Sequence, residues 1–138
     1  MSYRHELSHR QAHRIINAVQ AALDERKAGA AVAVVDPHGE LIALLRTDGC
    51  PLASINNAIH KAFTAARERV DSAVVGERSR TEGFPMTNFG DLRYTAWGGG
   101  VPVYEDGEVT GAVGVSGLSE EEDIELARLG AAAADAAA

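Results

Sequence analysis

Two stretches of the chain repeat apolar residues at the spacing of an amphipathic helix. The first covers residues 9–27, and its pattern predicts a helix that buries one face. Its apolar positions are Ala12, Ile15, Ile16, Val19 and Leu23. Ser8 and Gln11 form a capping box, in which a hydroxyl and a side-chain amide satisfy free amides at the helix start. Gly29 follows the last apolar position and marks the predicted end.

The second helical stretch covers residues 52–68. Its apolar positions are Leu52, Ile55, Ala58, Ile59, Ala62, Phe63 and Ala66. The opposite face carries Asn57, His60, Lys61 and Thr64, which fall within roughly a third of the helix circumference at the angular spacing of an α-helix. This polar strip is the first candidate for a binding surface.

Shorter apolar runs separated by turn residues predict strands. Residues 31–35 are a continuous apolar run, and residues 36–39 have strong turn chemistry before a returning strand over residues 40–46. Residues 92–97 and 101–105 are predicted strands, and Asp106-Gly107 is a two-residue hairpin turn that leads into residues 108–116. A second capping box at Ser119 begins a last helix, rich in alanine.

The segment between the second helix and these later strands has little periodicity. Asp71 caps a short predicted helix over residues 72–77, and residues 76–91 are predicted to be irregular. Irregular stretches of this length are uncommon in compact domains and often serve as lids or binding loops. The element order therefore predicts one α/β domain over residues 1–138, with a mainly antiparallel, five-stranded sheet flanked by helices.

Composition narrows the function classes. The net charge of −7 makes duplex nucleic acid and anionic membranes poor partners, and the 5% aromatic content disfavours a base-stacking platform. Cys50 is the single cysteine, so an internal disulfide is excluded and a reducing cytoplasm is expected. No apolar run approaches the roughly 20 residues of a membrane span, and the first residues lack a secretory signal.

Three consecutive glycines, Gly98, Gly99 and Gly100, lie between two of the predicted strands. Glycine runs weaken a strand because they lose side-chain packing and cost backbone entropy. One explanation is a ligand that rests on bare main-chain amides. The other is a bulge or kink that lets the sheet turn, and the glycines alone favour this second explanation.

Taken together, several segments resemble the GlcG/HbpS-type domains, which also form the C-terminal domain of certain cobalamin adenosyltransferases. The matching segments are residues 33–36 with Gly39, 46–49, 61–66, 98–103, 106–107 and 111–117, and Asp123. The resemblance implies a profilin-like fold with a five-stranded antiparallel sheet, and homo-oligomers from dimers to octamers. It also implies haem binding in some members, linked to haem sensing or degradation, with a histidine near the first helix.

The histidines and one lysine are the candidate reactive groups. His60 could bind iron or act as an acid/base near neutral pH, and its alternative is a surface or interface histidine. Lys61 could hold a ligand carboxylate or cover apolar surface. His9 and His13 share one face of the first helix by their i, i+4 spacing. They are either solvated or, by the resemblance, the source of a haem ligand.

Charged residues in the predicted loops could recognise a carboxylated ligand. Arginine does so with a planar fork of donors, and the alternative is a solvated loop. The candidates are Arg46, Asp48, Arg78, Arg80, Glu82 and Arg93, with Glu82 also a catalytic candidate. Trp97 is expected to line a pocket or fill core, and Cys50 is expected to be a packed thiol.

Three functions remain open from the sequence. The leading one is a small-ligand-binding protein whose pocket lies between residues 52–68, residues 78–97 and the glycines, with haem as the ligand implied by the resemblance. The second is a cofactor-independent lyase, isomerase or hydrolase acting on a small carboxylated metabolite, aromatic ones included, with His60 as acid/base and glycine amides stabilising an anion. The third is a structural accessory protein that forms oligomers.

Overall fold

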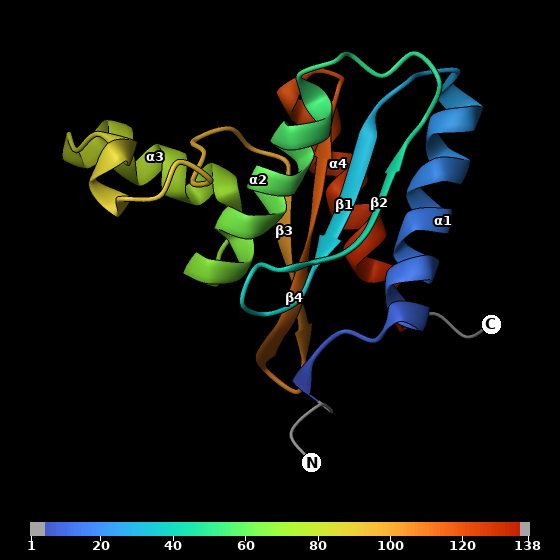
Figure 1. The fold of residues 1–138 in the computed structure, drawn as a ribbon, viewed down its shortest axis with the longest axis horizontal. Coiled ribbons are helices and arrows are strands. Elements are labelled where there is room, and N and C mark those ends of the chain that lie inside the picture. Colours follow the sequence, from blue (N-terminus) through green and yellow to red (C-terminus); the bar gives the residue numbers. More distant parts are fainter. Residues whose placement is uncertain (1–4, 136–138) are drawn as a thin grey trace.

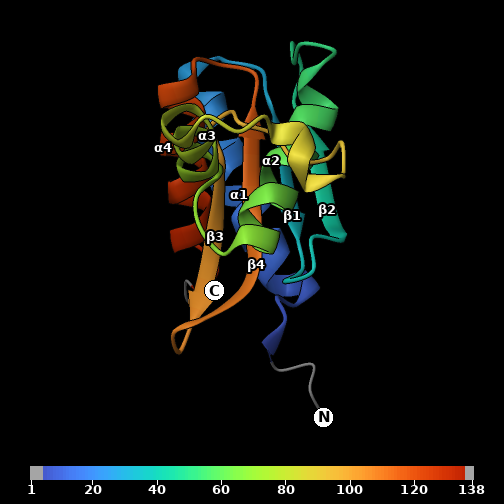
Figure 2. The ribbon, with the colours of Figure 1, turned by 90° about the vertical axis from the view of Figure 1, so that its left-hand side faces the viewer.

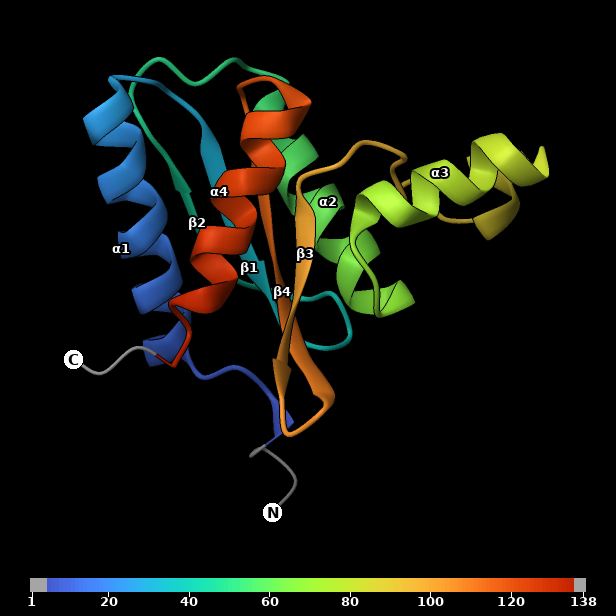
Figure 3. The same cartoon turned by 180° about the vertical axis from the view of Figure 1, so that it is seen from behind.

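The computed structural model describes residues 5–135. Its centre is a four-stranded antiparallel sheet with strand order β2-β1-β4-β3 (Figure 1). The strands are β1 (Ala31–Val35), β2 (Leu41–Arg46), β3 (Gly100–Glu105) and β4 (Glu108–Ser116). Seen from behind, α1 (His9–Arg26) and α4 (Glu120–Ala132) cover one face of the sheet, while α2 (Ser54–Glu68) packs on the other (Figure 3). The predicted mixed α/β architecture with flanking helices is confirmed.

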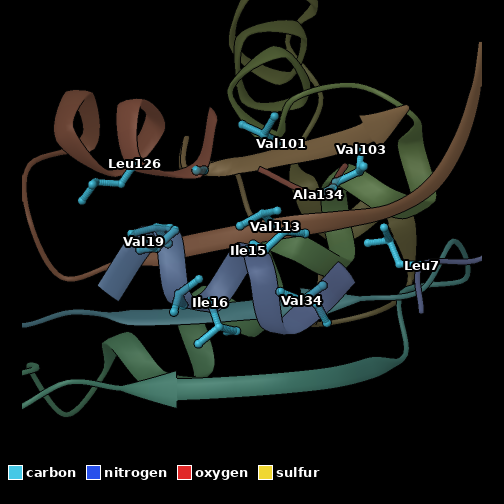
Figure 4. Close-up of a cluster of buried hydrophobic side chains, with 14 of the residues drawn as sticks. Leu7, Ile15, Ile16, Val19, Val34, Val101, Val103, Val113, Leu126 and Ala134 are labelled. Atoms are coloured by element: carbon cyan, nitrogen blue, oxygen red, sulfur yellow. The ribbon is translucent and has the colours of Figure 1, made fainter. Parts of the chain in front are cut away.

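Strand β1 is buried on both faces, because its side chains alternate between two cores. Val32 and Val34 join the larger core with Ile15, Val19 and other apolar side chains of α1, α4 and the sheet (Figure 4). The core beneath α2 is built almost entirely from alanine. Its buried members are Ala31, Ala33, Val35, Ala58, Ala62, Ala65, Ala66 and Ala112. Small side chains on both sides let the α2 backbone approach the sheet closely.

The helix starts follow the predicted capping chemistry. The Ser8 hydroxyl accepts from the Gln11 amide at 3.1 Å, and the Gln11 side chain accepts from the Ser8 amide at 3.0 Å, which completes the capping box of α1. The hydroxyl of Ser119 accepts from the Glu122 amide at the start of α4. Both helices begin where the sequence predicts.

The sheet has four strands, and the prediction of five is wrong. Residues 92–97 form a turn followed by irregular backbone instead of a strand, and Leu92 is 89% exposed. Their backbone is held by α2: the Thr95 amide donates to the Thr64 hydroxyl at 3.0 Å, and that hydroxyl donates to the Arg93 carbonyl at 3.5 Å. Because these groups bond to a helix side chain, the segment lies over α2 and the sheet edge begins only at β3.

The predicted irregular segment over residues 76–91 is also mostly helical. Helix α3 (Ser72–Glu82) is longer than predicted, and a 3-10 helix, η2 (Met86–Phe89), follows it. Only the first turns of α3 are buried, so the rest of the helix carries no apolar periodicity. Helix α3 projects from the sheet in Figure 1 and points toward the viewer in Figure 2. The rings of Phe89 and Tyr94 stack with their centroids 4.2 Å apart, which packs the end of η2 against residue 94.

Within residues 5–135, no helix has the length and apolar character needed to cross a membrane.

Candidate functional site

A hollow of about 360 Å³ opens where α2, the residues before β3 and the start of α4 meet. It is lined by Ser54, Asn57, Lys61, Trp97, Gly98, Ser116, Gly117, Leu118, Glu120 and Asp123. Four candidates from the sequence, Asn57, Lys61, Trp97 and Gly98, therefore come together here. A wider depression of about 540 Å³ follows the outer face of α4. Its described lining residues are all exposed or half-buried, whereas the smaller hollow includes the buried Lys61 and Asp123.

The floor of the hollow holds a buried ion pair. Lys61 and Asp123 are each 3% exposed, and the Lys61 Nζ lies 3.1 Å from the Asp123 Oδ2. The same Nζ donates to the Val115 carbonyl at 3.0 Å, and the Asp123 Oδ1 accepts from the Leu118 amide at 3.0 Å. Burial raises the pKa of the Asp123 carboxyl, and the Lys61 ammonium offsets part of that rise. The pair fixes the loop before α4 to the middle of α2.

The glycines beside the hollow let two stretches of backbone pack together. The Gly98 amide donates to Glu120 Oε2 at 2.6 Å, and the Gly100 amide donates to the Ser72 hydroxyl at 2.9 Å. A Cβ on Gly100 would overlap the Lys61 carbonyl, and one on Gly99 would lie 3.0 Å from the Lys61 Nζ. Two of the three amides are thus bonded within the protein, and the close approach of α2 leaves no room for a side chain at Gly100.

His60 lies outside the hollow, on the other side of the α2 polar strip. Its imidazole is half-buried. Burial lowers the pKa of His60 below its usual 6.5, the Arg93 guanidinium lowers it further, and Asp91 partly opposes both. Arg93 lies over the Phe63 ring at 4.1 Å and pairs with Asp91 at 2.8 Å. His60 is therefore a neutral imidazole near neutral pH, with an arginine beside it.

Replacing Arg93 with alanine is expected to raise the pKa of His60 toward 6.5. The substitution removes the guanidinium that disfavours the imidazolium, and it frees Asp91, whose carboxylate favours it. NMR titration of the His60 ring protons would measure the change, with the exposed His9 as an internal reference. An unchanged or lower midpoint for His60 would contradict the assigned role of Arg93.

Thr64 completes the polar strip but has a structural role. It is fully buried, and its hydroxyl bonds to the backbone of residues 93–95. The four residues of the polar strip therefore have three different surroundings. Asn57 and Lys61 line the hollow, and His60 lies beside Arg93. Thr64 holds the backbone of residues 93–95.

The remaining candidates lie elsewhere. Arg78, Arg80 and Glu82 are exposed on α3 and line none of the described hollows. Arg46 and Asp48 line a separate hollow of about 220 Å³ after β2, together with Cys50.

The first-helix histidines lie across the sheet from α2. His9 and His13 are exposed on α1. Within residues 5–135, no three or more His, Cys, Asp or Glu side chains gather in a way that could hold a metal ion.

Asp123 and Glu120 line the hollow but were not predicted as site residues, because capping and the helix dipole already explain a run of acids at a helix start. A signal for Asp123 does exist. It shares the buried face of α4 with Leu126, Ala127 and Gly130 at helical spacing, and an acid on an apolar stripe needs a buried partner. Glu120 carries no comparable signal.

Comparisons with known proteins agree on one family. A family model described as "Haem degrading protein HbpS-like" matches residues 7–132. GlcG of Escherichia coli (strain K12) is 36% identical over 118 residues, which cover 80% of this chain and 81% of GlcG. The crystal structure of a PduOC:heme complex has a TM-score of 0.85 and 25% identity, covering 93% of this chain and 94% of that one. A double mutant of Streptomyces reticuli HbpS has a TM-score of 0.84 and 29% identity, covering 92% and 86%.

Proposed function

This chain belongs to the HbpS-like family, and from that premise we propose that it binds a small organic ligand, haem first among the candidates, on the surface of α2 that carries His60. The observation that carries the proposal is the heme complex of PduOC, whose fold matches 93% of this chain. Because the likeness spans nearly the whole domain, the fold itself is one on which a relative holds heme.

The residues around His60 fit such a ligand. A neutral imidazole is the usual protein ligand of haem iron, and the lowered pKa of His60 keeps the ring neutral. Arg93 and Arg67 flank the same region and both lie over the Phe63 ring. They could pair with the two haem propionates, for which arginine offers a planar fork of donors. Bound haem would supply an iron centre, and this chain would hold and orient it.

Replacing His60 with alanine is expected to weaken haemin binding by about tenfold or more, since even residues that only support a metal ligand change affinity by that factor. Titration of the purified protein with haemin, followed at the Soret band, measures the affinity. The wild type should give a saturable, sharp band that the variant loses.

Matched variants test which histidine binds the haem iron. His38→Ala changes an exposed histidine in the turn between β1 and β2 and should bind haemin like the wild type. His13→Ala tests the first-helix histidine: loss of the Soret band there, with His60→Ala unaffected, would refute the assignment to His60. A wild type without a saturable Soret change would refute haem binding altogether.

The arrangement of its residues only partly fits the enzyme alternative. An acid/base at His60 would need both a carboxylate clamp and the glycine amides nearby. Arg93 lies beside His60, but Gly98 lines the separate hollow, and Arg78, Arg80 and Glu82 lie on the projecting α3. The accessory-protein alternative and the expected homo-oligomers stay predictions.

A further inference from the structure

We infer that the hollow between α2, Trp97 and the start of α4 is a second binding site, separate from the His60 surface, and that it takes a small neutral molecule with adjacent hydroxyl groups. This site differs from a haem site, because none of the described residues that line it is a histidine and its lining is too polar for a porphyrin face. Its ligand also differs from the carboxylated ligand that the sequence suggests.

The hollow offers hydrogen-bond donors and acceptors side by side. An ammonium has three donors, and the Lys61 Nζ bonds to two acceptors within residues 5–135, Val115 and Asp123. Lys61 lines the hollow, so its third proton can reach a ligand oxygen. Asn57 adds an amide that both donates and accepts, and Ser54 and Ser116 add hydroxyls. A hydroxyl group both donates and accepts hydrogen bonds, so a ligand with adjacent hydroxyls can pair with these neighbouring donors and acceptors.

The charge of the hollow excludes anions. Lys61 contributes one positive charge, while Glu120 and Asp123 contribute one negative charge each, so the lining carries a net charge of −1. Glu121 and Glu122 follow directly on α4 and add to the negative field. A ligand carboxylate would be repelled by this excess. A ligand amine placed next to Lys61 would be repelled by the buried ammonium, so at that position a neutral hydroxyl is favoured over either ion.

Trp97 supplies the apolar wall of the hollow. Its side chain is 58% exposed, although it is the largest aromatic side chain of the protein. Its backbone is held in place, because the carbonyl of Trp97 accepts from the Ser72 hydroxyl at 2.8 Å. Ligand pockets combine such flat apolar surfaces with a few placed polar groups. The C–H faces of a polyol would cover this ring while its hydroxyls reach Asn57 and Lys61.

The protein carries a single tryptophan, so the fluorescence of Trp97 reports directly on the hollow. We would titrate the full chain with three probes of the same carbon skeleton: glycerol, glycerate and 3-aminopropane-1,2-diol. Glycerol is expected to change the Trp97 emission saturably. Each charged probe is expected to bind about tenfold more weakly than glycerol, because its charge would lie in contact with the hollow without a partner of opposite charge.

Two neighbouring asparagines provide matched variants. Asn57→Ala removes a polar group from the hollow and is expected to weaken glycerol binding about fivefold. Asn56→Ala changes an exposed residue of the same helix that does not line the hollow, and it should bind glycerol like the wild type. Absence of a saturable glycerol response, stronger binding of either charged probe, or equal effects of the two variants would overturn the inference.

Haemin separates this inference from the proposed function. Asn57→Ala should leave the Soret titration unchanged, and His60→Ala should leave the glycerol response unchanged. If haemin binding fails while the glycerol response and its Asn57 dependence persist, only the haem proposal falls. If glycerol fails while haemin binds through His60, only the second site falls.

Discussion

Replacing Lys61 with methionine is expected to lower the free energy of unfolding by about 3–5 kcal/mol, the usual consequence of removing one partner of a buried ion pair. Asp123 would stay buried, with the Leu118 amide still bonded to it but no cation beside it. That loss is a large part of the roughly 5–15 kcal/mol that stabilises a typical domain. Urea unfolding followed by circular dichroism would measure the change.

Two further variants show whether the loss comes from the orphaned carboxylate. Lys61→Met combined with Asp123→Leu removes both charges, and it should recover most of the stability because an apolar pair of similar volume replaces the ion pair. Arg128 lies on the same helix as Asp123 and forms an exposed ion pair with Asp71. Arg128→Met breaks this pair and should lower the free energy of unfolding by less than about 1 kcal/mol. If the Lys61 variant were no less stable than the Arg128 variant, the pair would not matter for stability.

The pH dependence gives an independent check on Lys61→Met. Burial already raises the pKa of Asp123 in the folded protein, and without the Lys61 ammonium it should rise further. A carboxyl whose pKa is higher in the folded state than its unfolded value of 3.8 stabilises the folded protein at a pH below 3.8. That stabilisation is lost as the pH rises through the folded pKa. The deficit of the variant relative to the wild type should therefore shrink as the pH is lowered toward 4.

Local signals predicted the parts of the fold whose physics is local. The capping box at Ser8, the apolar stripe behind it and the turn at residues 36–39 each depend on residues a few positions apart, and the elements they predict are present. Helix α3 was missed beyond residue 77 because it buries only its first turns and therefore shows no apolar stripe. The error at residues 92–97 has a different source, since the hydroxyls of the distant residues Thr64 and Ser72 hold that backbone.

The candidate site was predicted in part for the same reason. Helical spacing placed Asn57 and Lys61 on one face, and the glycine run marked the backbone that faces them. The pairing of Lys61 with Asp123 spans 62 positions, so no local pattern could join them. Spacing also grouped His60 with Lys61, although the two lie on opposite sides of the polar strip and serve different surfaces.

Gly114 tests the claim that α2 rests directly on the sheet backbone. It lies in β4 between Ala33 of β1 and Gly100 of β3, so three small residues form the floor under α2. A Cβ on Gly114 would come within 2.7 Å of the Ala62 amide nitrogen and closer still to the Ala58 carbonyl. Both neighbours are helix backbone atoms, which cannot rotate away as a side chain would.

Gly114→Ala is therefore expected to destabilise the fold by about 3 kcal/mol or more, at or above the usual range for overpacking. Gly130→Ala in α4 is the comparison variant, because its added Cβ would meet side-chain methyls of Val19, Ile15 and Val113 at 2.9–3.4 Å and no backbone atom among its nearest neighbours. Gly130→Ala should therefore lose less stability than Gly114→Ala, because side-chain methyls can shift and alanine adds about 1 kcal/mol of helix propensity. Urea unfolding of both variants measures the difference, and equal stabilities would show that α2 does not press on Gly114.

The added methyl group of Gly114→Ala would also push α2 away from the sheet and widen the hollow. A shift of the Trp97 emission in Gly114→Ala, but not in Gly130→Ala, would therefore link the packing of α2 to the geometry of the second site.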